Sequence, residues 1–451
     1  MKTVDIIERI EGEAKLVCSW ENSRISDARI EFLNFRGFEY ILKNKPALDT
    51  LIYTPRICGI CGQAHLKATV EALENIYTNI NEPLEVTNKA KLLREIGLNI
   101  EIIDSHIKWF YMFIMPDIAK LSSDIKYEKY KAIKGSQWLN ASKITSEIIK
   151  SLAIIGGQWP HTSYMVPGGV MSDPTLLDLT SMQNYLDQAV IFFENSLAGV
   201  DIIDYLSFDN IDSLEKLDYA LKDFKNISFE NELEKIGKSY DSHIVLASSS
   251  LFESAKIKTK NKHKIDINKV KEENINSFKV NSTKKDNEYT WSKTALYNNE
   301  FYETGPLSRA LVSNRSFIKS IHKEYKDSVF TRVFARMDEF AHLLIKTKDL
   351  ISKIDISQES YIKPKYSYSE IEHASSISTV EAARGSLYHK IIMEKGIIKS
   401  YDVITPTVWN LGPGINAKLG VAQKAIIGVD SLEKAQIILR SFDVCSVCTT
   451  H

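Results

Sequence analysis

Two Cys-x-x-Cys pairs at opposite ends of the 451-residue chain constrain what it can fold into. The first pair is Cys58 and Cys61, and the second, 384 residues beyond Cys61, begins at Cys445 and ends at Cys448. Small zinc ribbons close a loop of roughly 15–20 residues between such pairs, and a thioredoxin-like motif uses one pair only. Four thiolates together form a soft ligand set for zinc, iron–sulfur or nickel. A site that joins both ends would therefore organise the whole chain around it.

The composition narrows the class of protein. Lys and Arg number 57 against 58 Asp and Glu, so the net charge of −1 argues against a generally basic nucleic-acid binder. The longest apolar run, residues 109–115, is far shorter than the roughly 20 residues that cross a bilayer, and it ends at Pro116. Asp5 and Glu8 stand where a secretory signal requires apolar residues. We expect no membrane span and no signal peptide, and we expect Cys18 to be a small buried hydrophobe.

Hydrophobic periodicity predicts a mainly helical α+β fold, a large multi-helix bundle with a small N-terminal β-sheet. Alternating apolar and polar residues over 9–17 and 28–33 predict a hairpin. Apolar repeats of three and four, with candidate caps, predict long helices over residues 87–116, 140–155, 172–206 and 329–354. Residues 256–285 are rich in lysine and asparagine, and we expect them to form a surface excursion within a single domain spanning residues 1–451.

The residues around both cysteine pairs are more specific than the cysteines alone. Residues 56–65 read Arg-Ile-Cys-Gly-Ile-Cys-Gly-Gln-Ala-His, and residues 443–451 read Asp-Val-Cys-Ser-Val-Cys-Thr-Thr-His. This combination resembles the two signatures of nickel–iron hydrogenase large subunits. Further motifs of that family follow in the same order, at residues 36–39, 116–117, 167–170, 305–309, 381–385 and 406–410. The resemblance extends over essentially the whole chain.

The resemblance implies reversible cleavage of H₂ into protons and electrons at a nickel–iron centre whose iron carries CO and cyanide. It implies that Cys58, Cys61, Cys445 and Cys448 bind nickel, and that Cys61 and Cys448 also bridge to the iron. A centre of this kind carries a formal charge of about −2, and a buried charge of that size requires cationic or hydrogen-bonding support.

The matching positions also imply roles for residues around the metals. By the resemblance, Arg384 lies over the open metal positions and Thr407 hydrogen-bonds a cyanide. His65 matches a histidine that hydrogen-bonds a cysteine sulfur, and Asp117 and Asp443 match two carboxylates packed near Arg384. Arg384, Asp117 and Asp443 are therefore candidate catalytic residues, whereas His65 and Thr407, with Arg384, are candidates for holding the cofactor.

Protons must leave such a buried centre. Glu11 matches the family glutamate that relays them from the terminal thiolate of Cys445, which is itself a candidate catalytic residue. Three positions depart from the family pattern: Ala383 and Val444 stand where proline is usual, and Glu13 stands where histidine is common. We expect Val444 to leave the terminal loop slightly less rigid without loss of metal binding.

A second metal is implied near the end of the sequence. Glu39, the backbone carbonyl of Val403 and His451 match the ligands of a family site that usually holds magnesium, a hard cation suited to oxygen ligands. Family precursors usually carry an extension after this histidine, which a maturation endopeptidase removes once the metals are bound. We expect His451 to be the processed end, and a gene without an extension is the alternative.

The electrons need a route through another chain. Once the four ligand cysteines are assigned, Cys18 alone cannot hold an iron–sulfur cluster, which normally takes four protein ligands. The family and the cysteine count therefore both imply an obligate heterodimer with a small iron–sulfur subunit. The modest length for the family favours a cytoplasmic enzyme. A higher oligomer, attachment to a membrane through partners and export to the periplasm with the partner remain open.

Two alternatives use the same cysteines. A regulatory subunit that senses H₂ would contain the same metal centre but would have negligible turnover. A structural zinc protein would need the four cysteines only, and Glu11, Arg384 and Asp443 would then be replaceable without consequence.

Overall fold

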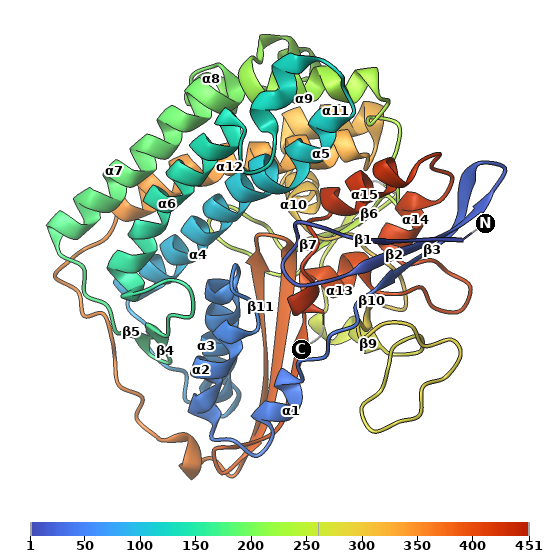
Figure 1. Cartoon of the computed structure of the whole chain (residues 1–451). Coiled ribbons are helices and arrows are strands. Elements are labelled where there is room, and N and C mark those ends of the chain that lie inside the picture. The colour runs from blue at the N-terminus through green and yellow to red at the C-terminus, as the bar shows by residue number, and fades with distance from the viewer. Residues whose placement is uncertain (1, 260, 450–451) are drawn as a thin grey trace.

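The computed structural model describes residues 2–259 and 261–449, and it places a layer of long helices beside a layer built around β-strands (Figure 1). Helices take 47% and strands 18% of the chain, which confirms the predicted α+β class. The helices are α1 (Phe38–Leu42), α2 (Thr50–Tyr53), α3 (Gly62–Asn79), α4 (Asn88–Lys108), α5 (Met115–Lys120), α6 (Ser136–Gly156), α7 (Leu176–Phe192), α8 (Ile202–Leu206), α9 (Tyr219–Glu230), α10 (Pro306–Val312), α11 (Ser316–Tyr325), α12 (Val329–Ser352), α13 (Pro406–Leu411), α14 (Val421–Ile426) and α15 (Leu432–Ser441). The strands are β1 (Lys2–Ile6), β2 (Lys15–Glu21), β3 (Arg24–Glu31), β4 (Met165–Val166), β5 (Gly169–Val170), β6 (Ser242–Val245), β7 (Ala255–Lys258), β8 (Asn261–His263), β9 (Val270–Glu273), β10 (Thr294–Tyr297), β11 (His373–Ala382), β12 (Gly385–Glu394) and β13 (Ile397–Ile404).

The long helices form the upper layer of the molecule in Figure 1. α4 packs against α6 and α12, and α6 packs against α7. Their facing apolar side chains belong to the main hydrophobic core, whose burial stabilises the fold at roughly 25 cal/mol per Å² removed from water. α12 confirms the prediction for residues 329–354 to within two residues at its end, and the Ser328 hydroxyl caps its first turn.

The predicted end of the helix over residues 87–116 is wrong. The helix starts where expected, with Thr87 as the cap of α4, but a π-helical segment, Trp109–Ile114, carries the chain on into α5. Pro116 lies in the first turn of α5, where a missing N–H leaves no hydrogen bond unmade. The wider π turn therefore lets the helix pass a residue that would otherwise stop it.

Two other predicted boundaries are also wrong. α6 begins at Ser136, because the Asn140 amide donates to the Ser196 hydroxyl instead of capping a helix. α7 is capped by Thr175 rather than by residues 172–174. A π-helical segment, Phe193–Ala198, continues α7, and Gly199, in the left-handed region, ends that segment before α8 starts. The predicted third helix is therefore two helices.

The small N-terminal sheet is confirmed, with its strands displaced. β2 pairs antiparallel with both β1 and β3. Residues 9–14 of the predicted strand are irregular instead, because Gly12 has a φ of +85°, which breaks the extended backbone. This segment runs beside the last part of the described chain, and Glu11 forms a parallel bridge with Cys445.

A second, longer sheet was not predicted. β11, β12 and β13 form an antiparallel meander in that order, and α3 packs against β11 and β12 (Figure 1). Both α3 and the meander reach the cysteine region. This sheet therefore contributes more to the position of the site than the N-terminal sheet does.

The remaining predictions concern the surface and the fifth cysteine. Residues 256–285 contain most of β7 and all of β8 and β9, and most of their described side chains are exposed or half-buried. Cys18 is fully buried in β2, and burial raises the pKa of its thiol to about 11, in agreement with a structural role. Among the described residues, no helix has the length and apolar character required to cross a membrane.

Candidate metal centre

The thiols of the two distant cysteine pairs meet in one buried cluster. The Sγ atoms of Cys58 and Cys445 are 3.6 Å apart, those of Cys61 and Cys448 are 3.5 Å apart, and those of Cys445 and Cys448 are 3.1 Å apart. All four side chains are buried and none forms a disulfide. Thiolates bound to one metal at about 2.3 Å lie about 3–4 Å from each other. The spacing therefore suits shared metal ligands.

The first pair is held at the start of α3. Cys61 precedes the helix, and the carboxylate of Glu101 accepts the backbone N–H groups of Gln63 and Ala64 at 2.8 and 3.1 Å. Burial raises the pKa of Glu101 to about 8, although these two N–H groups oppose the shift. Glu101 thus satisfies free donors at the N-terminus of the helix directly behind the cysteine.

The second pair is fixed by contacts with distant segments. The Thr405 hydroxyl donates to the Cys448 carbonyl oxygen at 2.6 Å, and the Ser446 N–H donates to the Glu11 carbonyl oxygen at 2.8 Å. Thr405 immediately precedes α13, which packs against residues 446–448. The terminal cysteine loop is therefore tied both to β13 and α13 and to the irregular N-terminal segment.

The cluster favours one thiolate over the other three. Burial opposes ionisation of Cys445, but hydrogen bonds from the neighbouring thiols and the positive charge of Arg384 lower its pKa well below the usual range. The pKa values of Cys58, Cys61 and Cys448 are raised instead. Binding of a metal must therefore release protons from these three thiols.

Arg384 lies at the tip of the hairpin formed by β11 and β12. Ala382 pairs with Gly385 across the hairpin, so Arg384 is one of two turn residues. Its Nη2 atom is 3.0 Å from Asp443 Oδ1, and its Nε donates to the Asp443 carbonyl oxygen at 3.2 Å. Burial opposes the charge of Arg384, but Asp443 and the cysteine thiolates raise its pKa well above the usual value. The guanidinium is therefore a fixed positive charge beside the thiols.

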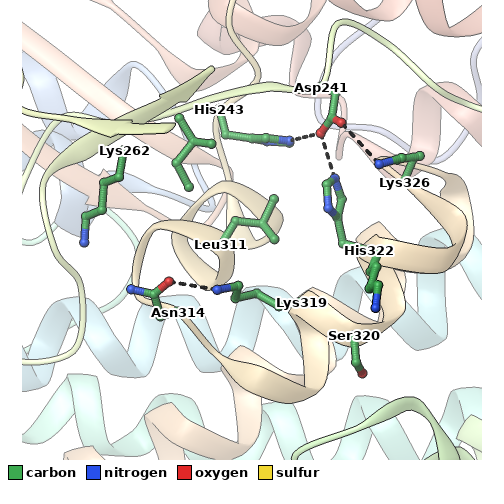
Figure 2. A pocket seen from close by; sticks show the side chains of 11 residues that line it. Asp241, His243, Lys262, Leu311, Asn314, Lys319, Ser320, His322 and Lys326 are labelled. Atoms are coloured by element: carbon green, nitrogen blue, oxygen red, sulfur yellow. Dashed lines mark hydrogen bonds and ion pairs between the residues drawn. The ribbon is translucent and has the colours of Figure 1, made fainter. Parts of the chain in front are cut away.

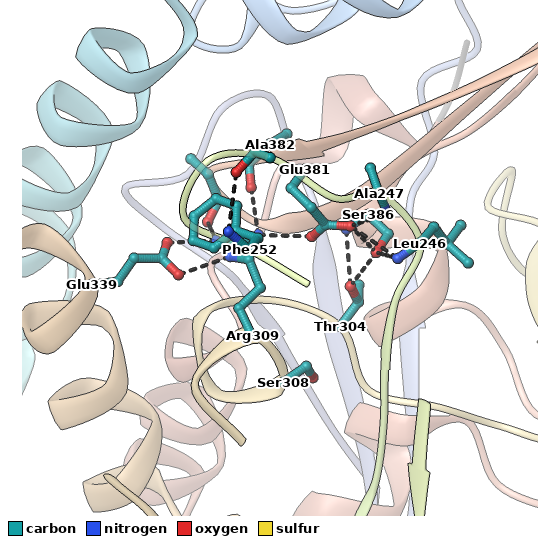
Figure 3. A network of polar contacts seen from close by, with 12 residues as sticks. Leu246, Ala247, Phe252, Thr304, Ser308, Arg309, Glu339, Glu381, Ala382 and Ser386 are labelled. Atoms are coloured by element: carbon teal, nitrogen blue, oxygen red, sulfur yellow. Dashed lines mark hydrogen bonds and ion pairs between the residues drawn. The ribbon is translucent and has the colours of Figure 1, made fainter. Parts of the chain in front are cut away.

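A buried ionic network fixes this turn from behind (Figure 3). Arg309, on α10, donates from Nε and Nη2 to the Glu339 carboxylate of α12 at 2.8 and 2.6 Å. It also donates from Nη1 to Glu381 at 3.0 Å and to the Ala382 carbonyl oxygen at 2.9 Å. Burial opposes ionisation of Glu339, but Arg309 keeps its pKa well below the usual range. Because each charge is paired, the network holds the residues just before Arg384 in place.

Replacement of Gly385 by alanine is expected to lower the free energy of unfolding by about 2–5 kcal/mol. Gly385 has a φ of +131°, and an added Cβ would lie 2.6 Å from two side-chain atoms of Thr304. Gly428 provides a matched control, because it has a φ of +85° but no atom near the position of an added Cβ. Denaturant unfolding should show a clearly larger decrease in the free energy of unfolding for Gly385→Ala than for Gly428→Ala. Equal decreases would contradict the steric argument.

Asp443 joins two arginines at the cluster. Its Oδ1 atom faces Arg384, and its Oδ2 atom accepts from Arg336 Nη1 at 2.8 Å. The φ of Asp443 is +62°, a left-handed conformation that aspartate adopts more readily than most residues. The predicted neighbourhood of Asp443 and Arg384 is therefore present, with Arg336 as a partner that the sequence did not indicate.

Asp117 does not share this arrangement. It forms ion pairs with Arg9, Lys120 and Arg440, and no ion pair with Arg384 occurs in the described part of the chain. The reason is the continued helix, because α5 packs against α15 and so directs Asp117 to the side chain of Arg440. Of the two carboxylates expected near Arg384, Asp443 therefore forms an ion pair with it in the described chain, and Asp117 pairs with other cations.

Glu11 lies at the boundary between the cluster and the surface. Its side chain is half-buried, and its Oε1 atom lies 3.3 Å from the position that a Cβ would take on Gly59. Burial, followed by the negative charge of Cys445, raises the pKa of Glu11, although Arg384 and Arg36 partly oppose the shift. A carboxyl group with a raised pKa beside a thiolate is suited to exchanging protons near neutral pH.

His65, on α3, lies beside the cluster, and Thr407 lies on α13, the helix that packs against residues 446–448. A ring nitrogen of His65 lies within 4.8 Å of the sulfur atoms of Cys61 and Cys448. Thr407 is buried, and its hydroxyl has no hydrogen-bond partner among the described residues. The roles that the resemblance implies for these two side chains remain predictions.

Comparison with known proteins decides the family. The model for nickel-dependent hydrogenases matches residues 36–137 and 129–451. The chain belongs to this family. Among its relatives, the periplasmic NiFeSe hydrogenase large subunit of Desulfomicrobium baculatum is 23% identical over 100% of this chain and 94% of its own length. The sulfhydrogenase 1 subunit alpha of Pyrococcus furiosus is 24% identical over 100% of this chain and 97% of its own length.

Solved structures confirm the fold of this hydrogenase chain. The reduced Ni-Fe-Se hydrogenase from D. vulgaris Hildenborough superposes with a TM-score of 0.84 at 22% identity, over 100% of both chains. A reduced, active Ni-Fe-Se hydrogenase from Desulfomicrobium baculatum also gives 0.84, at 20% identity and over 100% of both chains. The predicted family, the class of enzyme and the large-subunit fold are therefore confirmed.

The hydrogenase chain has further buried residues at the site that sequence reasoning missed. His389 lies on β12, and its Nε2 atom is 3.1 Å from His65 Nδ1. The Nδ1 atom of His389 is 2.7 Å from the Tyr401 hydroxyl oxygen. Arg36 donates to the carbonyl oxygens of Arg56 and Ile57, directly before the first cysteine. His389 lies in a strand whose first five residues are all buried, so only the folded structure reveals the contact.

The residues predicted for magnesium are partly described. Glu39 and Val403 lie together. The contact between them is made by the Val403 N–H, which donates to Glu39 Oε1 at 2.9 Å, and not by the carbonyl that was predicted as a ligand. Glu39 Oε2 is also 3.0 Å from Lys293 Nζ, which in turn contacts Glu272 at 2.6 Å. His451 lies outside the described residues. The structure therefore brings two of the three predicted residues together and adds a lysine that the sequence did not indicate.

Proposed function

We propose that this chain is the catalytic subunit of a nickel–iron hydrogenase that cleaves H₂ reversibly and passes the electrons to a small iron–sulfur subunit. The observation that carries the proposal is the convergence of four buried thiols from opposite ends of the chain beside Arg384. When bound, a nickel–iron centre carrying CO and cyanide would supply the redox chemistry. The four thiols would hold it, with Cys61 and Cys448 shared between nickel and iron.

Two buried polar atoms support the fit of such a centre. Arg384 Nη1 and Thr407 Oγ1 are inaccessible to solvent and have no hydrogen-bond partner in the described part of the chain. An unpaired buried donor costs about 1–3 kcal/mol unless a bound group accepts its hydrogen bond. Cyanide nitrogens are acceptors, and a negatively charged centre would also balance the guanidinium. A structural zinc site would leave both atoms unexplained.

The chain's own residues suggest how protons move. Cys445 is the thiol of the cluster whose pKa is lowered, by hydrogen bonds from the neighbouring thiols and by Arg384, so it is ionised and would readily pass on a proton that it takes up. Glu11 is bridged to Cys445 through the backbone and has a raised pKa. We infer that Glu11 accepts the proton from Cys445 and releases it towards the surface, while Arg384 and Asp443 keep the reacting face polar and rigid.

The partner is proposed from the cysteines and from the surface. Cys18, the one cysteine outside the cluster, is fully buried, so the described chain offers no ligands for an iron–sulfur cluster. Large apolar side chains are exposed in the segment between β3 and the first cysteine pair: Leu33, Phe35, Tyr40, Ile41, Leu48 and Ile52. Such a patch is typical of a protein interface. We infer that the small subunit covers it in an obligate heterodimer.

Other finer assignments complete the proposal. Glu39, the Val403 carbonyl and His451 would bind magnesium, provided that Lys293 moves away from Glu39 or bonds to a water of the magnesium shell. A maturation endopeptidase would cut after His451, which the intact mass of a precursor would test. We propose a cytoplasmic enzyme, whereas the Desulfomicrobium relative is periplasmic. Cell fractionation would distinguish the two compartments.

The decisive experiment is metal analysis of the heterodimer purified under reducing, oxygen-free conditions. We expect one nickel and one iron per large subunit beyond the iron of the small subunit, together with H₂-dependent reduction of a dye. Zinc alone in untreated protein would refute the proposal. Negligible turnover with a retained response to H₂ would favour the sensory alternative.

The Arg384→Lys variant is expected to lose roughly 10²-fold or more in H₂ oxidation while retaining nickel and iron. Lysine keeps the charge, but it lacks the planar set of donors with which Arg384 contacts Asp443 Oδ1 and the Asp443 carbonyl oxygen while Nη1 points into the site. Arg29→Lys is a matched control, because Arg29 is about half exposed and lies on β3. Dye-reduction kinetics would test this, and full activity in Arg384→Lys would show that the planar guanidinium has no specific role.

A further inference from the structure

A second cluster of metal-ligating side chains lies outside the cysteine cluster. Asp241, His243 and His322 line a pocket of about 720 Å³, and one ligand atom from each lies within 4.8 Å of the other two. Asp241 and His243 are at the start of β6, and His322 is on α11 (Figure 2). The hydrogenase mechanism proposed above uses none of these residues.

The hydrogen bonds around His243 determine which of its nitrogens is free to bind an ion. The Ser308 hydroxyl donates to the Glu303 carbonyl oxygen at 2.8 Å, so its oxygen accepts from His243 Nδ1 at 3.1 Å. A neutral imidazole has one N–H, and Nε2 then carries a lone pair. Nε2 is buried without a hydrogen-bond partner in the described chain, and it faces Asp241 Oδ1 at 3.6 Å. In the neutral ring, two electron-pair donors therefore face each other, an arrangement that a shared cation stabilises.

His322 directs its Nε2 atom to the same carboxylate oxygen. The two atoms are 2.8 Å apart, but the contact lacks hydrogen-bond geometry. The separations of 2.8 and 3.6 Å bracket the about 3.3 Å edge of a tetrahedron whose ligands lie about 2.0 Å from zinc. Lys326 approaches the other oxygen, Asp241 Oδ2, at 3.9 Å, so Oδ1 is left to the two imidazoles (Figure 2).

The electrostatics of the cluster favour a positive charge at this point. Contacts with His243 and then His322 lower the pKa of Asp241, so its carboxylate is ionised at neutral pH. Burial opposes a charge on His243, but Asp241, Glu303 and Asp327 raise its pKa overall. The positive charge can be a proton on His243 or a metal ion bound to all three side chains, and these two states differ in their ability to bind zinc.

We propose that Asp241, His243 and His322 bind one divalent transition-metal ion of the zinc class, independently of the four cysteines. Two imidazole nitrogens and one carboxylate oxygen are a borderline ligand set suited to such an ion, and a water from the pocket would complete the shell. Ser308 would orient His243 through Nδ1, as second-shell groups commonly do. The ion would tie β6 to α11.

Zinc uptake by the intact heterodimer tests the proposal. The protein, with its nickel–iron centre in place, is washed with a weak chelator and dialysed against Zn²⁺. We expect wild type to bind one zinc that His322→Ala and Asp241→Asn bind at least about tenfold more weakly. His373→Ala, which removes an exposed histidine at the start of β11, should bind as wild type does. Any zinc that binds at the proposed magnesium site would bind equally to wild type and to the three variants, so it would not affect the comparison between them.

Two further measurements keep the result unambiguous. Asp241→Asn changes charge but hardly changes size, and circular dichroism with unchanged nickel content would show that the variants are folded. Anomalous scattering at the zinc edge, from crystals soaked in zinc chloride, should place a peak between His322 Nε2 and Asp241 Oδ1. Absence of saturable zinc uptake, uptake that is equal in wild type and both variants, or a peak only elsewhere would overturn the proposal.

Discussion

Replacement of Cys448 by serine is expected to reduce the nickel content of the heterodimer to below about a tenth of that of wild type and to abolish H₂ oxidation. Cys448 lies 3.1 Å from Cys445 and 3.5 Å from Cys61, so it contacts both halves of the cluster. A serine hydroxyl stays protonated at neutral pH and is a hard donor, so it cannot replace a soft thiolate as a metal ligand. Elemental analysis and dye reduction on the same sample would measure both effects.

Cys18→Ser is the matched control for this result. Cys18 is as deeply buried as the cluster but lies in β2, away from the other thiols. Its replacement should cost about 1–3 kcal/mol of stability, because a hydroxyl is buried there, and should leave nickel and iron in place. Equal metal loss in both variants would mean that a damaged fold, rather than a missing ligand, explains the Cys448 result. Retained nickel in Cys448→Ser would contradict the proposed centre.

The site was more predictable from the sequence than the fold around it. Cys58 and Cys445 could be placed together because the residues around each cysteine pair carried the family pattern, and Arg384 was found through a separate motif at residues 381–385. These signals are local in sequence, although the contacts between the two ends are not. A metal site requires particular residue types, so it can be recognised in the sequence even where the packing around it cannot.

Other features depended on tertiary contacts that no local pattern records. Pro116 is a helix breaker in isolation, and only the π turn before it makes the helix continue. The alternation in residues 9–14 resembled a strand, but Gly12 and the bridge to Cys445 override it. Asp117 matched a family position, yet the direction of α5 gives it Arg440 as a partner. In the last two cases a long-range contact, with Cys445 or with Arg440, outweighs the local preference.

Replacement of Glu11 by glutamine is expected to slow H₂/D⁺ exchange by about 10²–10³-fold while nickel and iron stay in place. Glutamine has nearly the same shape as glutamate but cannot accept and release a proton at neutral pH. The Ser446 N–H bonds to the backbone carbonyl of Glu11, so the substitution leaves the bridge to the cysteine loop intact. Mass spectrometry of HD formation on metal-loaded heterodimer would measure the rate.

The pH dependence separates a proton relay from a structural role for Glu11. Only the ionised carboxylate can accept a proton from Cys445, so exchange in wild type should rise with pH as Glu11 ionises, at a pKa raised above the ordinary value by burial and by the Cys445 charge. Glu11→Gln should lose this rise, whereas Glu8→Gln, whose side chain is 73% exposed, should keep both the rise and the rate. If Glu11→Gln retained the wild-type rate and pH profile, protons would have to leave the thiols by another route, and the contacts of His65 with His389 would become the next path to test.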